Sequence, residues 1–223
     1  MHVVNVPKVA VSAGPSFPVR RIYCVGRNYR AHAVEMGKDP DRDPPFFFMK
    51  PSDSLVPSGA TISYPPRTEN YHFETELVVA IGTEGADIPV DEAENHVFGY
   101  AAGLDMTRRD LQLAARDSGR PWDMGKGADQ SAPIGTIHPR AETGALSSGK
   151  IELKVNGDIK QSSDLQKLIW SVPEIVSDLS GYVRLMPGDL IYTGTPEGVG
   201  AIKSGDRLEV TIEGLSPLVV EIG

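Results

Sequence analysis

Polar and apolar residues alternate most clearly in the last third of the chain. Residues 151–155 alternate between aliphatic and charged side chains, and Asn156-Gly157 follows at once. A period of two predicts a strand with one buried face, and Asn-Gly after such a segment is a strong hairpin signal. Residues 208–212 repeat the alternation after a Gly-Asp turn. This third of the chain is therefore predicted to be rich in β-strands.

The remainder is predicted to hold shorter elements. Apolar runs bounded by turn residues indicate strands, and apolar positions three or four apart after a capping signal indicate helices. In chain order, we expect a strand at 22–26, a short helix at 28–36, a mobile charged loop at 38–45, a strand at 74–81, a helix from a Thr107/Asp110 capping box to Gly119, and a helix at 168–182 with Pro173 in its first turn.

Composition narrows the class of protein. The chain has 223 residues, 40% of them hydrophobic, with 23 Gly and 18 Pro. This favours one sheet-rich domain with many turns, residues 21–223, after a short N-terminal extension at 1–20. A net charge of -8 argues against nucleic acid and anionic membrane surfaces as partners. The single cysteine, Cys24, allows no internal disulfide, and no secretory signal or membrane-spanning run is seen, so we expect a cytoplasmic protein.

Three acidic residues form the first candidate site. Glu74 and Glu76 are two apart on a predicted strand, so their side chains point to one face. Asp105 ends the apolar run 100–104, where a lone acid is unusual in a core. Carboxylates without a nearby cysteine favour Mg²⁺, Mn²⁺ or Ca²⁺ over zinc. The alternatives are a solvent-facing acidic pair and, for Asp105, a helix cap.

Basic residues supply further candidates. His32 and Glu35 are three apart on a predicted helix, the arrangement of an oriented general base, although a surface ion pair has the same spacing. Lys126 lies in a Gly-Lys-Gly turn and is either a functional cation or an exposed loop lysine. Arg109 and Gln112 share one face of the helix after Asp105 and could both reach a bound carboxylate.

Two more segments are candidates for the walls of a pocket. Lys50 follows the aromatic run 46–48 and could close one side. The loop 193–200 is rich in Gly but lacks the ending of a phosphate-binding loop, and its backbone N–H groups could still cradle a carboxylate. Cys24 lies on an apolar strand and is expected to be buried rather than reactive.

In combination, these residues resemble the fumarylacetoacetate hydrolase family, in its acylpyruvase and fumarylpyruvate hydrolase branch. The resemblance runs from about Ile22 to the C-terminus. It rests on the motifs Gly26-Arg27-Asn28-Tyr29, Phe48-Met49-Lys50-Pro51, Phe73-Glu74-Thr75-Glu76-Leu77, Gly103-Leu104-Asp105-Met106-Thr107, Gly188-Asp189, Thr193-Gly194-Thr195-Pro196 and Gly198-Val199-Gly200.

The resemblance implies a fold and a set of roles. The fold would be mainly β, of the α+β class: a mixed β-sandwich roll with a few short peripheral helices, usually as a homodimer. Glu74, Glu76 and Asp105 would bind Mg²⁺ or Mn²⁺. His32 and Glu35 would form a catalytic dyad, with Lys126 beside the reacting oxygen. The 2-oxo acid end of the substrate would be held by Lys50, Arg109, Gln112 and Thr195.

The reaction implied is hydrolysis of the C3–C4 bond of a 2,4-dioxo acid to pyruvate and a carboxylic acid. Fumarylpyruvate of gentisate breakdown is favoured over neutral acylpyruvates, because Arg30, Lys38 and Arg42 offer cations for a distal carboxylate. A 2-oxo acid decarboxylase acting on oxaloacetate, or an isomerase of aromatic breakdown, would use the same metal site. A non-catalytic binding domain is the remaining alternative.

Overall fold

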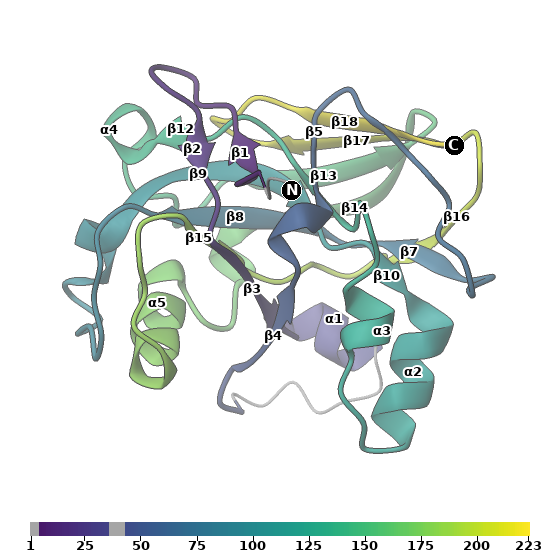
Figure 1. Cartoon of the computed structure of the whole chain (residues 1–223), viewed down its shortest axis with the longest axis horizontal. Coiled ribbons are helices and arrows are strands. Elements are labelled where there is room, and N and C mark those ends of the chain that lie inside the picture. The colour runs from purple at the N-terminus through teal and green to yellow at the C-terminus, as the bar shows by residue number, and fades with distance from the viewer. Residues whose placement is uncertain (1–4, 36–42) are drawn as a thin grey trace.

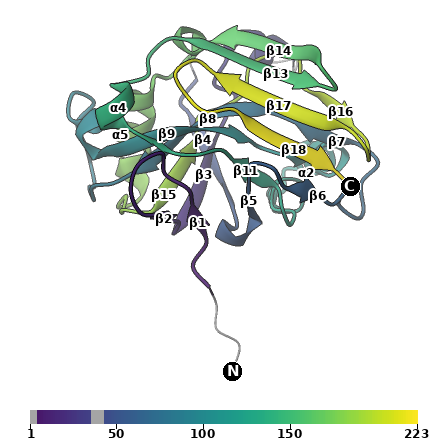
Figure 2. The same cartoon turned by 90° about the horizontal axis from the view of Figure 1, so that it is seen from above.

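The computed structural model describes residues 5–35 and 43–223, except the side chains of residues 33–35. Two large sheets lie one over the other (Figure 1, Figure 2). The eight-stranded sheet runs in the order β4 (Phe46–Lys50), β3 (Arg21–Gly26), β15 (Asp189–Tyr192), β8 (Thr75–Ile81), β9 (Val97–Leu104), β11 (Ala132–Ile134) and β5 (Leu55–Pro57), with β12 (His138–Pro139) beside β9. The five-stranded sheet runs in the order β14 (Asp158–Asp164), β13 (Lys150–Val155), β17 (Arg207–Ile212), β18 (Leu218–Ile222) and β6 (Thr61–Ile62).

Smaller elements surround these sheets. A three-stranded sheet runs in the order β10 (Thr107–Arg108), β7 (Tyr71–Phe73) and β16 (Gly200–Ile202), and β1 (Lys8–Val9) pairs with β2 (Phe17–Pro18). The helices are α1 (Arg30–Glu35), α2 (Arg109–Asp117), α3 (Asp123–Lys126), α4 (Arg140–Thr143) and α5 (Val172–Tyr182), with short 3₁₀ turns at Ser52–Ser54, Ala93–His96 and Leu165–Lys167. The expected mixed β-sandwich roll with a few short peripheral helices is thus confirmed.

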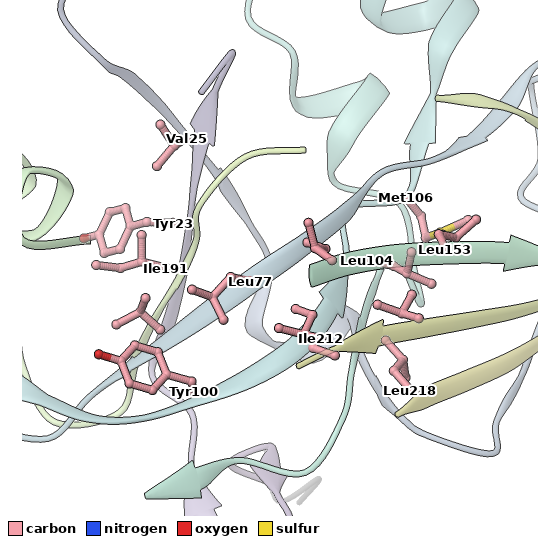
Figure 3. Close-up of a cluster of buried hydrophobic side chains, with 14 of the residues drawn as sticks. Tyr23, Val25, Leu77, Tyr100, Leu104, Met106, Leu153, Ile191, Ile212 and Leu218 are labelled. Atoms are coloured by element: carbon pink, nitrogen blue, oxygen red, sulfur yellow. The ribbon is translucent and has the colours of Figure 1, made fainter. Parts of the chain in front are cut away.

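The main core lies between the two large sheets (Figure 3). Leu77 and Leu104 of the larger sheet are fully buried, as are Leu153 and Leu218 of the smaller sheet. Burying a Leu side chain of this kind stabilises a fold by about 1.5–3 kcal/mol. This packing fixes β8 and β9, the two strands that lead into the acidic residues.

Strand β8 is buried on both faces, and all seven of its residues are inaccessible. One face meets the main core, and the other joins a second apolar cluster with Val9 and Phe17 from the N-terminal hairpin. A strand covered on both faces shows an apolar run instead of alternation, as residues 77–81 do. The division into 1–20 and 21–223 stays a prediction.

Most predicted elements are confirmed, with two corrections at helix starts. The helix after Asp105 begins at Arg109, and Thr107 lies in strand β10, so the predicted capping box is wrong. The Asp110 carboxylate accepts hydrogen bonds from Thr68 and the Glu69 N–H instead, which holds the connection between β6 and β7 against the helix.

The second correction concerns the predicted helix at 168–182. Strand β14 ends at Asp164, and α5 begins at Val172 rather than at residue 168. At its start, both the N–H and the hydroxyl of Ser171 donate to the Glu174 carboxylate. Pro173 lies in the first turn, as expected. Most of the predicted loop at 38–45 lies outside the described residues. Within the described residues, no helix is long and apolar enough to span a membrane.

Candidate functional site

The three predicted acidic residues converge at the end of strands β8 and β9. Glu74 joins β7 to β8, Glu76 lies in β8 opposite Gly103, and Asp105 follows β9. The Asp105 N–H donates to the Glu74 carbonyl at 2.9 Å, which extends the pairing of the two strands beyond β9. One carboxylate oxygen from each acid lies within 4.8 Å of the others, and all three side chains are buried. The structure therefore excludes both the solvent-facing pair and the helix cap.

The surroundings give two of these acids opposite pKa shifts. Burial raises the pKa of Glu74, but the positive charges of Lys126 and Arg109 outweigh burial and hold that pKa well below its usual range. Burial, together with the charges of Asp105 and Glu74, raises the pKa of Glu76 well above its usual range. A proton on Glu76 relieves the crowding of like charges, and a bound cation would do the same.

Two buried lysines hold the acids in place. Lys126 Nζ donates to Glu74 Oε2 at 2.8 Å, Asp105 Oδ2 at 2.7 Å and Thr107 Oγ1 at 2.7 Å. Burial lowers the pKa of Lys126, but Asp105 and Glu74 outweigh it and raise that pKa above the usual value. These contacts with the two carboxylates favour the ammonium form of Lys126.

Lys50 acts from the other side of Asp105. Its Nζ donates to the carbonyls of Met106, at 3.0 Å, and Lys126, and lies 2.8 Å from Asp105 Oδ1 as an ion pair. Because the side chain is fully buried, it offers no surface to a ligand. Asp105 Oδ1 is left without a hydrogen bond.

Helices α2 and α3 bring the basic residues to the acids, and they lie side by side below the sheets (Figure 1). A Cβ on Gly125 would come within 2.8 Å of the backbone of Gln112, so only glycine lets α3 pack this closely and place Lys126. Arg109 forms an ion pair with Glu74 and donates to Gln112 Oε1 at 2.8 Å. The predicted placement of Arg109 and Gln112 on one helix face is confirmed, and their contact with a bound carboxylate stays a prediction.

The Gly-rich loop after β15 reaches the site through its backbone. The Gly194 N–H donates to Glu76 Oε2 at 2.8 Å, so the loop cradles one of the protein's own carboxylates. Gly194 has a φ of 100°, and a Cβ there would come within 2.6 Å of Asn28. Glycine is needed on both counts.

Gln161, a residue that the sequence did not single out, holds this loop against β8. Its amide nitrogen donates to Thr195 Oγ1 and the Pro196 carbonyl, and its oxygen accepts from the Thr75 N–H. Thr75 lies between Glu74 and Glu76, so one buried amide on β14 connects the acidic strand to the loop.

A cavity of about 140 Å³ opens beside Glu74. His32 of α1 is only 5% exposed and lines this cavity, as do Arg109, Gln112 and Lys126. Arg27, Arg116 and Trp122 complete the lining. Glu35 ends α1, but its side chain lies outside the described residues, so the His32–Glu35 pairing stays a prediction.

The acids have the composition of a divalent-cation site. Three converging carboxylates suit a hard cation, and one oxygen from each lies within 4.8 Å of the others, close enough to share one ion. Cys24 is buried and burial raises its thiol pKa, so the thiol is neither a ligand nor a nucleophile. The residues present therefore fit Mg²⁺ or Mn²⁺.

Comparisons with known proteins bear on the same residues. Residues 21–222 match the model of the fumarylacetoacetate (FAA) hydrolase C-terminal family. A fumarylpyruvate hydrolase of Ralstonia is 52% identical over 190 residues, which cover 84% of this chain and 98% of that protein. A mitochondrial oxaloacetate tautomerase of Arabidopsis thaliana is 40% identical and covers 91% of this chain and 90% of its own.

A solved structure resembles the whole chain. The crystal structure of fumarylpyruvate hydrolase from Pseudomonas aeruginosa, in complex with Mn²⁺ and pyruvate, superimposes with a TM-score of 0.97. It is 52% identical in sequence, and the match covers 100% of this chain and 97% of that one.

Proposed function

The chain belongs to the fumarylacetoacetate hydrolase family, and from this premise we propose that it is a metal-dependent hydrolase of the fumarylpyruvate type. It cleaves the C3–C4 bond of a 2,4-dioxo acid to give pyruvate and a second carboxylic acid. The observation that carries this proposal is the buried cluster of three carboxylates and three cations beside a cavity lined by His32. A relative and a solved structure that are both fumarylpyruvate hydrolases support the substrate class.

Charge balance in the cluster suits an anionic substrate. Glu74, Glu76 and Asp105 carry three potential negative charges, and three buried cations contact this cluster: Lys50, Lys126 and Arg109. A divalent cation added to this balanced set leaves an excess positive charge in a buried site, where electrostatic attraction is strong. Fumarylpyruvate carries two carboxylates and complements that charge.

Glu74, Glu76 and Asp105 would hold the metal. The bound cation would supply a positive charge that attracts the 2-oxo carboxylate and stabilises the enolate of the departing pyruvate. Lys50 has no surface toward the cavity, so we assign it to fixing the orientation of Asp105 rather than to contacting substrate. Arg109, Gln112 and Thr195 would orient the 2-oxo acid end.

His32 is the proposed base, with Glu35 orienting its ring. Lys126 is held as an ammonium group, so among the residues that line the cavity the imidazole is the group suited to take a proton from water. The resulting hydroxide adds to C4, and the C3–C4 bond breaks with its electron pair left on C3. A proton then converts the enolate to pyruvate, and the water oxygen stays in the new carboxylate.

Lys126 is proposed to stabilise the oxyanion at C4. All three of its N–H donors are in use, and the hydroxyl of Thr107 is the one neutral acceptor among them. Hydrogen bonds to charged oxygens are roughly twice as strong as those to neutral ones. The Thr107 bond is therefore the one that Lys126 exchanges for the oxyanion.

Turnover with product identification tests this function. Purified protein is incubated with fumarylpyruvate or oxaloacetate in the presence of Mn²⁺, Mg²⁺ or EDTA, and products are followed by NMR. We expect pyruvate and fumarate in equal amounts with either metal and none with EDTA. Enol–keto exchange or decarboxylation of oxaloacetate without cleavage of fumarylpyruvate would assign the chain to the alternative chemistry, which the tautomerase relatives favour.

The setting of this activity is also a proposal. We place the chain in the cytoplasm, in the breakdown of aromatic compounds through gentisate, and as a homodimer. Light scattering at micromolar concentration gives the oligomeric state, since a dimer has twice the mass of the 24.0 kDa chain.

A further inference from the structure

Helix α2 carries a second basic residue, Arg116, that the proposed chemistry does not use. Arg109, Gln112 and Arg116 occur at positions i, i+3 and i+7, which place all three on one face of the helix. All three line the 140 Å³ cavity. Arg109 contacts the acidic cluster at one end, and Arg116 lies about 10 Å farther along at ~1.5 Å of rise per residue.

Arg27, between β3 and α1, lines the same cavity. Its φ of 55° is uncommon for a residue with a side chain, and such strain persists where the surroundings require it, often at functional sites. The next residue, Asn28, is fully buried and bonds to the Thr193 and Trp170 carbonyls, so the backbone conformation is imposed from one side. The Arg27 guanidinium lies 5.0 Å over the ring of Phe46.

Both arginines remain available to a ligand. Within the part of the chain that the structure describes, no carboxylate lies at ion-pair distance from Arg27. Among the described residues, Arg116 forms an ion pair with its neighbour Asp117, whose side chain is 65% exposed. Exposed pairs of this kind contribute little and exchange readily.

The wall of this cavity is partly aromatic. Arg27, Trp122 and Lys126 line both the 140 Å³ cavity and an adjoining one of about 540 Å³. Trp122 packs against Phe46 and Phe48, which line the outer cavity. The cavity beside the acidic cluster is therefore also lined by an aromatic ring, Trp122, and by two arginines, Arg27 and Arg116.

We infer that Arg27 and Arg116 form a subsite for a second carboxylate, so that this protein selects dioxo acids that end in a carboxylate. The inference rests on the proposed function. A seven-carbon dioxo diacid has six carbon–carbon bonds between its carboxyl carbons, about 7 Å when extended. The rise of about 10 Å along α2 from Arg109 to Arg116 is of the same order as that length, and guanidinium groups bind carboxylates through two hydrogen bonds.

Binding of acids that cannot be cleaved tests the subsite independently of turnover. We compare 2-oxoheptanedioate with 2-oxoheptanoate, which differ only in the distal carboxylate and lack the C4 carbonyl. Calorimetry with Mn²⁺ is expected to show at least tenfold tighter binding of the diacid. Arg116→Gln and Arg27→Gln should each remove about tenfold of that preference and leave the affinity for the monoacid within about twofold.

Arg120→Gln is the matched control, because Arg120 lies just beyond α2, is exposed and lines neither cavity. It should bind both acids as the unaltered protein does. If Arg27→Gln fails to fold, Arg116→Gln on the exposed end of α2 carries the test alone. Equal loss for both acids, or no loss for either, overturns the subsite. A diacid preference without fumarylpyruvate cleavage would preserve the subsite and reject the hydrolase.

Discussion

Glu74, which joins β7 to β8, and Glu76, in β8, are two residues apart, yet their surroundings shift their pKa values in opposite directions. Glu74 contacts Lys126 and Arg109, whereas Glu76 faces the other two acids and receives one backbone N–H from Gly194. The three carboxylates therefore repel one another at Glu76, and a bound cation would relieve that repulsion. Removing any one of the three acids should weaken metal binding without exposing the core.

The role of His32 can be tested at the same scale. His32→Ala should lower kcat for fumarylpyruvate by about 10²- to 10⁴-fold, the usual contribution of a general base. Binding of oxalate, an enolate mimic, should persist in the presence of Mg²⁺, because the three acids are untouched. His96→Ala is a suitable control, since His96 lies at the opposite end of β9 from Asp105. Its ring Nδ1 bonds to the Thr83 carbonyl, away from the acids. Near-normal turnover by His32→Ala would reject the assignment.

At the scale of elements, the site depends on how strands and loops are connected. Strand β14 belongs to the smaller sheet, but its Gln161 bonds to both the acidic strand and the loop after β15. The two large sheets are therefore linked by polar contacts at the site as well as by the apolar core in Figure 3.

Gln161→Leu should test this link. The substitution leaves the Thr75 N–H and the Pro196 carbonyl without their partner, at a cost of about 1–3 kcal/mol for each buried group left unsatisfied. We expect a lower melting temperature and a lower kcat, with Mn²⁺ affinity reduced as well because Glu76 loses its support. Ser162→Ala, on the exposed face of the same strand, should change neither property. Normal activity in Gln161→Leu would show that the loop holds its place without the amide.

At the scale of the whole molecule, metal binding is coupled to folding. The candidate ligands come from two strands, and the residues around them span the chain from α1 to the loop after β15. An unfolded chain cannot bring these groups together, so a cation that binds the folded site stabilises the whole fold.

Thermal unfolding should measure that coupling. Mn²⁺ at 100 times its dissociation constant adds about 2.7 kcal/mol. For a chain of this size that amounts to a rise of about 5–10 °C in melting temperature. EDTA should abolish the rise, and so should Glu76→Gln. If Mn²⁺ leaves the melting temperature of the unaltered protein unchanged, the acids hold no metal under these conditions.

The sequence predicted the acids and the fold because their signals are local. The i, i+2 spacing of Glu74 and Glu76, the position of Asp105 at the end of an apolar run, and the family motifs are all visible within a few residues. Confirmed strands at 151–155 and 208–212 have the same origin, since alternation is a local pattern.

What the sequence missed depends on contacts between distant segments. Gln161 acts on residues 86 and 34 positions away, and no periodic pattern reveals such a contact. The sequence predicts that Thr107 caps a helix. Its hydroxyl instead accepts a hydrogen bond from Lys126, which lies 19 residues later in the chain. Arg116 differs from these residues, because its spacing of seven from Arg109 is visible in the sequence. The cavity that both arginines line is visible only in the structure.

Hydrolysis in water enriched in oxygen-18 tests the central claim most directly. Fumarylpyruvate is incubated with the Mn²⁺-loaded protein, and the products are separated and weighed by mass spectrometry. Attack of water on C4 requires that the fumarate gains one solvent oxygen in its new carboxylate, so the labelled fraction is at least the oxygen-18 fraction of the water, with pyruvate in equal amount. Absence of fumarate, or fumarate that carries no label, would contradict a metal-dependent hydrolase at this site.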